Sequence, residues 1–249
     1  MIIAIDIGNT RTKIAMFEKD TVLETQVFEQ VFFEKKIIEI LEKNTSKTKI
    51  ILSSVGKLNT QTFDWLKKNT EIIIISHESI FPFKNLYATP STLGIDRMVL
   101  AAGAVLQHPN CNRLVIDAGT CITYEFINHR NEYLGGAISP GLLLRYKALN
   151  HYTEKLPLLS PIDIDYLIGN QTDQSIHSGV INGITQEIDG IINQYKSLYP
   201  DIKIILTGGD TLFLVKRLKN VIFANSNFLL ESLNNLYQYI IENDKKNLL

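Results

Sequence analysis

A chain of 249 residues, 45% apolar and 20% charged, can bury a core without disulfides or metal ions, and it is long enough for one large domain or two smaller ones. The formal net charge of −1 and the scattered lysines and arginines argue against a nucleic-acid-binding surface. The two cysteines, Cys111 and Cys121, fit no common zinc spacing, and so few cysteines indicate a reducing compartment.

The N-terminal sequence has neither the basic start nor the long apolar stretch of a signal peptide. Nowhere do about 18 apolar residues follow one another, so we expect no transmembrane helix. These features predict a cytoplasmic protein with no membrane partner and no nucleic-acid partner.

Short β-rich runs alternate with helical stretches along the first part of the chain, which is typical of an α/β protein. The predicted strands here are Ile2–Asp6, Thr12–Phe17, Val22–Phe28, Lys49–Val55 and Ile72–Ser76. The predicted helices are Phe33–Lys43, Thr60–Lys68 and Ile95–Gln107.

The same order then starts again. The predicted strands are Arg113–Asp117, Cys121–Ile127, Tyr133–Ile138, Lys203–Thr207 and Val221–Ala224. One predicted helix follows Pro140, and the others cover Asp173–Tyr195, Thr211–Leu218 and Phe228–Ile241. This repetition predicts two domains of one fold, residues 1–110 and 111–249, that face each other across a cleft.

The two halves also share a local motif, an apolar strand that ends in Asp-x-Gly and is followed by a small polar turn. The motif occurs at Asp6–Gly8 and again at Asp117–Gly119. Burying two unpaired carboxylates costs much free energy unless a cation lies beside them. We therefore expect Asp6 and Asp117 to face each other with a cation nearby. In isolation each motif could be an ordinary hairpin turn, with Asp6 capping its own turn.

Neither a Walker loop nor a Gly-x-Gly-x-x-Gly motif is present, so a nucleotide site has to be built from other turns. A hairpin turn presents backbone N–H groups to an anion, Gly8 allows close approach, and Asp6 could hold Mg²⁺. The predicted phosphate loop is Asp6, Ile7, Gly8, Asn9, Thr10, Arg11, Thr12 and Lys13. Gly208 and Gly209 follow a late strand and would let adenosine lie against the backbone.

Several motifs along nearly the whole chain resemble those of type III pantothenate kinase, a family of the actin-like (ribonuclease H-like) nucleotidase superfamily. They are Asp6-x-Gly8-Asn9-Thr10, Gly94-Ile95-Asp96-Arg97, Asp117-Ala118-Gly119-Thr120, Gly135–Gly141, Thr153–Pro157, Gly169–Thr172 and Leu206–Asp210. The resemblance implies two actin-like domains, each with a five-stranded mixed sheet and flanking helices, in a homodimer. It implies ATP-dependent phosphorylation of pantothenate, the first step of coenzyme A synthesis, with Mg²⁺ and a monovalent cation, K⁺ or NH₄⁺.

The resemblance also assigns roles to residues of this chain. Thr120 would contact ATP, Asp117 would bind the monovalent cation, and Asp96 would accept the proton of the substrate hydroxyl. The pantothenate pocket would be lined by Tyr87, Gly94, Ile95, Asp96, Arg97 and Thr172. These roles suit phosphoryl transfer to pantothenate, because the aspartate can accept the proton of its hydroxyl and the neighbouring arginine can bind its carboxylate.

Other interpretations of these residues remain open. Asp96 could be an acidic residue favoured in a first helical turn, Thr172 could be a helix N-cap, and Tyr87 could be a packing residue. Two other functions also remain, a non-catalytic binding or regulatory protein on the same fold and a kinase for another small alcohol. An intact Asp96–Arg97 pair favours a kinase, because a binding module has no need of a base.

Overall fold

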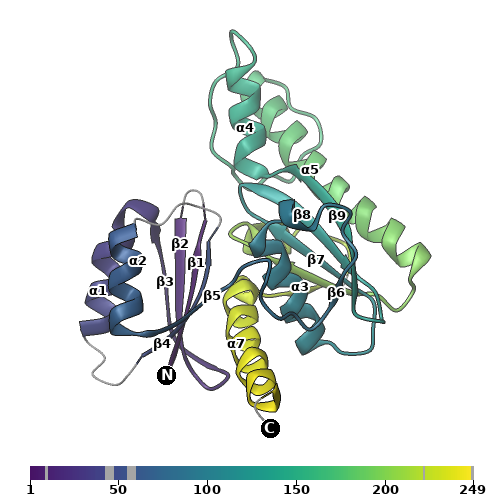
Figure 1. Cartoon of the computed structure of the whole chain (residues 1–249). Helices are drawn as coiled ribbons and strands as arrows, with labels where there is room; N and C mark the ends of the chain where they lie inside the picture. Colours follow the sequence, from purple (N-terminus) through teal and green to yellow (C-terminus); the bar gives the residue numbers. More distant parts are fainter. Residues whose placement is uncertain (9–10, 43–47, 55–59, 221, 248–249) are drawn as a thin grey trace. The chain divides into compact units, whose positions relative to one another are not determined.

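The computed structural model describes residues 1–8, 11–42, 48–54, 60–220 and 222–247. Its contacts divide the chain into two compact units, each with its own sheet (Figure 1). The first unit holds Met1–Pro109, Asn131–Tyr133 and Asn227–Leu249, and the second holds Asn110–Arg130 and Leu134–Ser226.

The first unit is built on a five-stranded sheet of order β3-β2-β1-β4-β5. Its strands are β1 (Ile2–Ile7), β2 (Arg11–Glu18), β3 (Thr21–Glu29), β4 (Lys49–Ser54) and β5 (Glu71–Ile74). Its helices are η1 (Gln30–Phe32), α1 (Phe33–Glu42), α2 (Thr60–Asn69), η2 (Pro90–Thr92), α3 (Ile95–Gln107) and α7 (Phe228–Asn247), with a short strand β6 (Lys84–Asn85). The strands β1 and β2 are antiparallel, whereas β1, β4 and β5 run parallel.

Every residue of β1 is buried, which is typical of a central strand that is covered on both faces. Side chains alternate along a strand, so Ile3, Ile5 and Ile7 share one face, where they pack with Ile37 of α1 and Leu66 of α2. The helix α7 contacts β1, β2 and β4, and it also packs along α3. Two helical layers therefore cover β1.

The helices α3 and α7 pack closely because one position between them has no side chain. A Cβ atom on Gly103 would lie 1.8 Å from Oγ of Ser232, whose residue is fully buried. A larger residue at position 103 would force the two helices apart.

The second unit contains the strands β7 (Arg113–Ala118), β8 (Cys121–Ile127), β10 (Lys203–Thr207) and β11 (Phe223–Ala224), and β9 (Glu132–Pro140) from Leu134 onward. Its helices are α4 (Leu142–His151), α5 (Thr172–Leu198) and α6 (Thr211–Leu214). The apolar stripe of α5, which includes Ile181, Ile184 and Ile188, packs on Leu114 and Ile116 of β7.

The strand order of the second sheet repeats that of the first. The order is β11-β10-β7-β8-β9-β6, and β7 pairs antiparallel with β8 and parallel with β10. The predicted α/β fold of two similar mixed sheets is therefore confirmed. The predicted count of five strands is wrong for the second sheet, because β6 pairs with Glu132 and Tyr133 at the start of β9. A two-residue strand carries no periodic pattern, so only this pairing defines it.

The boundary predicted between residues 110 and 111 lies one residue from a change of unit, which falls between Pro109 and Asn110. The last helix, α7, nevertheless packs on the first unit, although the prediction places it in a domain of residues 111–249. The two units are defined by contacts, whereas the predicted domains are defined by the repeated order of strands and helices. The division into domains 1–110 and 111–249 therefore stays a prediction. No helix in the described part of the chain is long and apolar enough to cross a membrane.

Candidate functional site

The turn after β1 begins at a nearly buried carboxylate. Asp6 is 8% exposed, and its Oδ1 accepts a hydrogen bond of 2.8 Å from Oγ of Ser53 on β4. Lys13 of β2 lies directly opposite Asp6 in the antiparallel register, and its side chain is half-buried. The pairing of β1 with β2 therefore places a carboxylate and an ammonium group on the same face beside one turn.

The turn itself is tight where it leaves β1. The N–H of Gly8 donates to the carbonyl of Arg11 at 3.0 Å, and a Cβ on Gly8 would lie 3.1 Å from that oxygen. Ile7 and Thr12 are fully buried, whereas Arg11 is exposed. The predicted loop residues Asn9 and Thr10 lie outside the described residues.

Thr12 has a buried hydroxyl that makes no hydrogen bond in the described part of the chain. A buried hydroxyl without a hydrogen bond costs about 1–3 kcal/mol of stability. A ligand that forms a hydrogen bond with Oγ1 of Thr12 would recover this free energy. This atom is therefore a structural sign, independent of the motif, that the turn is shaped for a polar ligand.

The turn after β7 repeats this arrangement in the second unit. The N–H of Gly119 donates to the carbonyl of Cys121 at 2.9 Å, and Thr120 is exposed at the tip. Asp117 pairs in register with Thr123 of β8, as Asp6 pairs with Lys13. The Oγ1 atom of Thr123 is buried and, like that of Thr12, has no hydrogen-bond partner among the described residues.

Thr123 is a residue that the motif analysis missed. The signal that could have found it is the duplicated hairpin, because the residue opposite each Asp-x-Gly aspartate faces the same way as that aspartate. Carboxylate and hydroxyl oxygens are ligands that hard cations prefer. Asp117 and Thr123 therefore fit a cation, and Asp6 fits one beside its own turn.

The predicted adenosine turn lies against the turn after β7. Gly208 has a φ of +101°, and a Cβ on it would lie 2.2 Å from the carbonyl oxygen of Ala118 and 2.4 Å from Oδ1 of Asp117. Asp210 donates its N–H to the same carbonyl at 3.0 Å. Gly209 is exposed with open space beside its Cα, so the structure brings Gly208 to Asp117 and leaves the surface at Gly209 clear.

The start of α3 brings together an aspartate and a buried arginine. Gly94 is the N-cap, and Oδ1 of Asp96 accepts the backbone N–H of Arg97 at 2.9 Å. A Cβ on Gly94 would lie 2.4 Å from that same oxygen, so the glycine leaves room for the Asp96 carboxylate. Asp96 thus accepts a hydrogen bond in the first turn of α3, as the helix-start interpretation expects, but this bond uses only one of its two carboxylate oxygens. Its Oδ2 makes no hydrogen bond within the described residues.

Arg97 is 7% exposed, and its guanidinium carbon lies 5.7 Å from the ring centre of Tyr87. Tyr87 in turn packs near Tyr133 with ring centres 6.1 Å apart. The predicted pocket residues Tyr87 and Arg97 are thus neighbours, through a cation–π contact. The packing interpretation of Tyr87 is therefore confirmed, whereas its role in a pantothenate pocket stays a prediction.

Thr172 is the first residue of α5 and is exposed, with Gln171 as the N-cap. The N-cap interpretation of Thr172 is therefore wrong by one residue. The preceding turn is compact, because a Cβ on Gly169 would lie 2.4 Å from the N–H nitrogen of Ser175.

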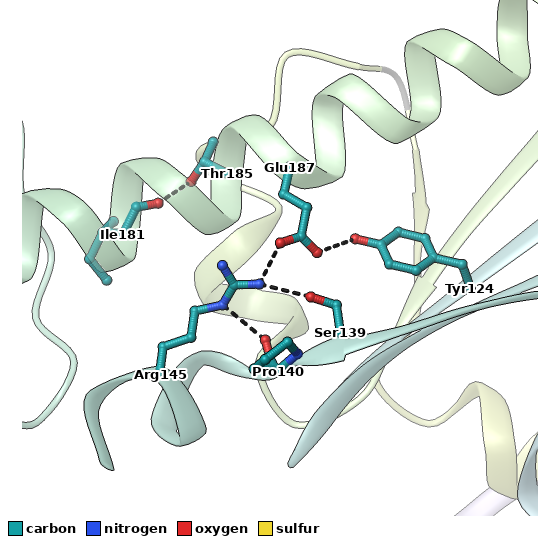
Figure 2. A network of polar contacts seen from close by, with 7 residues as sticks. All are labelled: Tyr124, Ser139, Pro140, Arg145, Ile181, Thr185 and Glu187. Atoms are coloured by element: carbon teal, nitrogen blue, oxygen red, sulfur yellow. Dashed lines mark hydrogen bonds and ion pairs between the residues drawn. The ribbon is translucent and has the colours of Figure 1, made fainter. Parts of the chain in front are cut away.

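A polar network that the sequence did not predict joins β8, the end of β9, α4 and α5 (Figure 2). Arg145 of α4 forms an ion pair of 2.5 Å with Glu187 of α5, and Tyr124 of β8 donates its hydroxyl to Glu187 at 3.1 Å. Burial opposes ionisation of Glu187, but hydrogen bonds from Ser139, Arg145 and Tyr124 together lower its pKa below the ordinary value. Burial and then the Glu187 charge raise the pKa of Tyr124.

Solved structures define the class of this fold. A Campylobacter jejuni protein described as a Baf family transcriptional activator covers 98% of this chain and 99% of its own, with a TM-score of 0.62 and 23% identity. A Listeria monocytogenes protein described as an N-acetylmannosamine kinase covers 96% and 99%, with a TM-score of 0.52 and 16% identity. At such identities the similarity concerns the fold alone, which is the two-domain actin-like fold.

Sequence comparison then identifies the family. The family description "Type III pantothenate kinase" matches residues 2–194. A relative of that name from Flavobacterium johnsoniae is 58% identical over 98% of this chain and 100% of its own length. Another, from Phocaeicola vulgatus, is 39% identical over 98% and 100%. The chain belongs to the type III pantothenate kinase family.

Proposed function

We infer that this chain transfers the γ-phosphoryl group of ATP to the hydroxyl group of pantothenate, the first step of coenzyme A biosynthesis. The observation that carries this inference is identity of 58% to a type III pantothenate kinase over essentially the whole of both chains. In the reaction the hydroxyl oxygen forms a bond to the γ-phosphorus, the bond from that phosphorus to the β-bridging oxygen breaks, and ADP leaves.

We propose that the turn after β1, residues Asp6–Lys13, binds the phosphates of ATP. Lys13 beside Asp6, the exposed Arg11 and the unsatisfied hydroxyl of Thr12 support this assignment. Cationic and hydroxyl donors neutralise and orient phosphate oxygens, which is most of what a phosphoryl-transfer site has to do. Thr120, Gly208 and the open surface at Gly209 would hold the rest of the nucleotide.

Oxygen ligands beside the two turns support a role for cations. Asp6 would hold Mg²⁺, which neutralises phosphate charge when it is bound. Asp117, with the hydroxyl of Thr123, would hold the monovalent cation, K⁺ or NH₄⁺. No cationic side chain stands opposite Asp117 in the strand register, unlike at Asp6.

Asp96 is the proposed proton acceptor of the substrate hydroxyl. Its Oδ1 is held by the N–H of Arg97, which fixes the carboxylate and leaves Oδ2 for the proton. The buried guanidinium of Arg97 is suited to grip the pantothenate carboxylate, with Tyr87 holding the guanidinium in place. Gly94, Ile95 and Thr172 would complete the pocket.

We propose that the chain acts as a homodimer in the cytoplasm. Large apolar side chains are exposed on α4 and the segment that follows it, and such a patch is typical of an interface. They are Leu143, Leu144, Tyr152, Leu158, Ile162, Leu167 and Ile168. Light scattering coupled to size-exclusion chromatography would distinguish a dimer of about twice the 28.2 kDa chain mass from a monomer.

The test of the function is ADP release by the purified chain with ATP, Mg²⁺ and pantothenate, with and without K⁺. Turnover that needs both pantothenate and K⁺ and is lost in Asp96→Asn supports the reaction, the cation and the base together. Turnover with another alcohol but not with pantothenate would overturn the substrate, and no turnover with any acceptor would favour a binding protein.

A further inference from the structure

The turn after β7 has no room to move independently of the segment that precedes α4. The N–H of Gly141 donates to the carbonyl of Thr120 at 3.1 Å. A Cβ on Gly141 would lie only 2.0 Å from the carbonyl oxygen of Gly119 and 2.5 Å from that of Thr120. The backbone at Gly141 therefore touches the backbone of the turn, and any displacement of Gly141 is passed to Thr120.

One arginine fixes the segment that carries Gly141. Arg145 donates from Nε to the carbonyl of Pro140 at 2.9 Å and from Nη2 to Oγ of Ser139 at 3.0 Å. Its own N–H donates to the carbonyl of Gly141 at 3.1 Å, in the first turn of α4. A planar guanidinium that bonds two consecutive residues holds the backbone direction as well as its position.

Glu187 fixes the arginine in turn. Figure 2 shows its carboxylate, on the long helix α5, between Arg145 and the ring of Tyr124. One carboxylate oxygen accepts from Nη2 of Arg145 at 2.5 Å, and the other accepts from the Tyr124 hydroxyl at 3.1 Å. The side chains of Arg145 and Glu187 are 20% and 26% exposed, so water screens this pair only partly.

We propose that Arg145 and Glu187 are positioning residues for the ATP-binding turn Gly119–Thr120, acting through Ser139–Gly141. The chain of contacts runs from Glu187 to Arg145, from Arg145 to Pro140, and from Gly141 to Thr120. This inference rests on the proposed role of Thr120 in binding ATP. It predicts that the pair sets the affinity for ATP, whereas the pantothenate residues at the start of α3 do not depend on it.

The test compares Arg145→Met and Glu187→Gln with the unchanged full-length chain. Kd for a non-hydrolysable ATP analogue is measured by calorimetry, and KM is measured separately for ATP and for pantothenate. Arg145→Met is expected to raise the Kd and KM for ATP about tenfold and Glu187→Gln about threefold, while KM for pantothenate stays within about twofold. Arg145→Lys, which keeps the charge but not the fork, is expected to recover only part of the loss.

A matched control is Arg217→Met. Arg217 also forms an ion pair with a carboxylate, that of Asp163, and donates to a backbone carbonyl, that of Ile164 at 2.6 Å, in the same unit. Arg217 anchors a different segment from Arg145. The Arg217→Met substitution is therefore expected to lower the melting temperature without changing the Kd for ATP.

Folded Arg145→Met and Glu187→Gln chains with an unchanged Kd for ATP would overturn the proposal. So would a parallel rise in the KM for both substrates, or an equal rise in the Kd for ATP in Arg217→Met, since these report general loosening. If Arg145→Met does not fold, Glu187→Gln decides the question. If the unchanged chain binds no ATP, the proposed function fails instead, and the two failures are distinguishable.

Discussion

The two Asp-x-Gly turns start from the same strand geometry and end with different chemistry. In the first unit, Lys13 stands opposite Asp6, the exposed Arg11 begins β2, and a serine on the neighbouring strand bonds the aspartate. In the second, Thr123 stands opposite Asp117, and the turn is enclosed by backbone from Gly141 and Gly208.

This difference separates the two kinds of ligand that a kinase has to hold. Ammonium and guanidinium groups suit the anionic phosphates, whereas a carboxylate, a hydroxyl and close carbonyl groups suit a cation. A duplicated hairpin would thus serve the two proposed roles through one change at the strand position opposite the aspartate.

The proposed proton acceptor, Asp96, lies in neither turn but at the start of α3. Asp96→Asn is expected to lower kcat by about a thousandfold, the usual scale for loss of a general base, because an amide cannot accept the proton. Kd for ATP is expected to remain within about twofold of the unchanged value. Steady-state kinetics and calorimetry measure the two quantities.

Asp6→Asn and Asp117→Asn are the controls for that variant. Each is expected to weaken nucleotide or cation binding rather than to remove turnover at saturating ligand. A loss of kcat in Asp117→Asn as large as that in Asp96→Asn would contradict the assignment of the base to α3.

The second turn is enclosed by backbone, so its glycines are expected to tolerate substitution poorly. Gly208→Ala places a Cβ 2.2 Å from the carbonyl oxygen of Ala118 at a φ of +101°. A free energy of unfolding lowered by about 3 kcal/mol is expected from the clash and the strain together. Urea unfolding followed by circular dichroism measures it.

Gly209→Ala is the adjacent control, since open space surrounds that position. Its free energy of unfolding is expected to stay within about 0.5 kcal/mol of the unchanged chain. Equal destabilisation by the two substitutions would mean that Gly208 is not enclosed as described.

The residues opposite the two aspartates provide the direct test of the comparison. Lys13→Met is expected to raise KM for ATP by about tenfold to a hundredfold, which corresponds to loss of one charged hydrogen bond. Thr123→Val is expected to raise the K⁺ concentration for half-maximal activity about fivefold, with KM for ATP unchanged at saturating K⁺.

A readout without turnover accompanies this pair of variants. The shift in melting temperature between KCl and NaCl is expected to shrink in Thr123→Val and to persist in Lys13→Met, because only the first removes a proposed cation ligand. A melting-temperature shift that persists in Thr123→Val and shrinks in Lys13→Met would contradict the assignment of the cation to the second turn.

The smallest effect concerns the network that supports the second turn. The folded protein lowers the pKa of Glu187 below 4.5, so ionised Glu187 stabilises the fold above that pH. The stabilisation is lost as the pH falls through the lowered pKa. Glu187→Gln is expected to lower the free energy of unfolding by about 1–2 kcal/mol at pH 7.

Urea unfolding at several pH values between 7 and 3 measures the difference between Glu187→Gln and the unchanged chain. The difference is expected to shrink as the pH falls below 4.5, where the Glu187 charge is lost. A difference that is constant over this range would show that the ion pair with Arg145 does not stabilise the fold.

The sequence by itself determined the family, the two-sheet α/β fold and most of the helices and strands. This was possible because each signal is local: alternating apolar residues mark strands, and motifs such as Asp6–Gly8 and Gly94–Arg97 are contiguous. The closeness of Tyr87 to Arg97 also agrees with the pocket that the resemblance implied, although the roles of both residues stay predictions.

Only the tertiary structure decided the features that depend on pairing between distant segments. The strand β6 and the packing of α7 on the first unit follow from such contacts. The helix α6 also ends at Leu214, earlier than the predicted Leu218. The dependence on tertiary contacts also holds for Thr123 opposite Asp117 and for the contacts of Arg145 with Glu187, Ser139 and Pro140. Residues 42 positions apart, as Arg145 and Glu187 are, meet because two helices pack on one sheet, and no local pattern encodes that meeting.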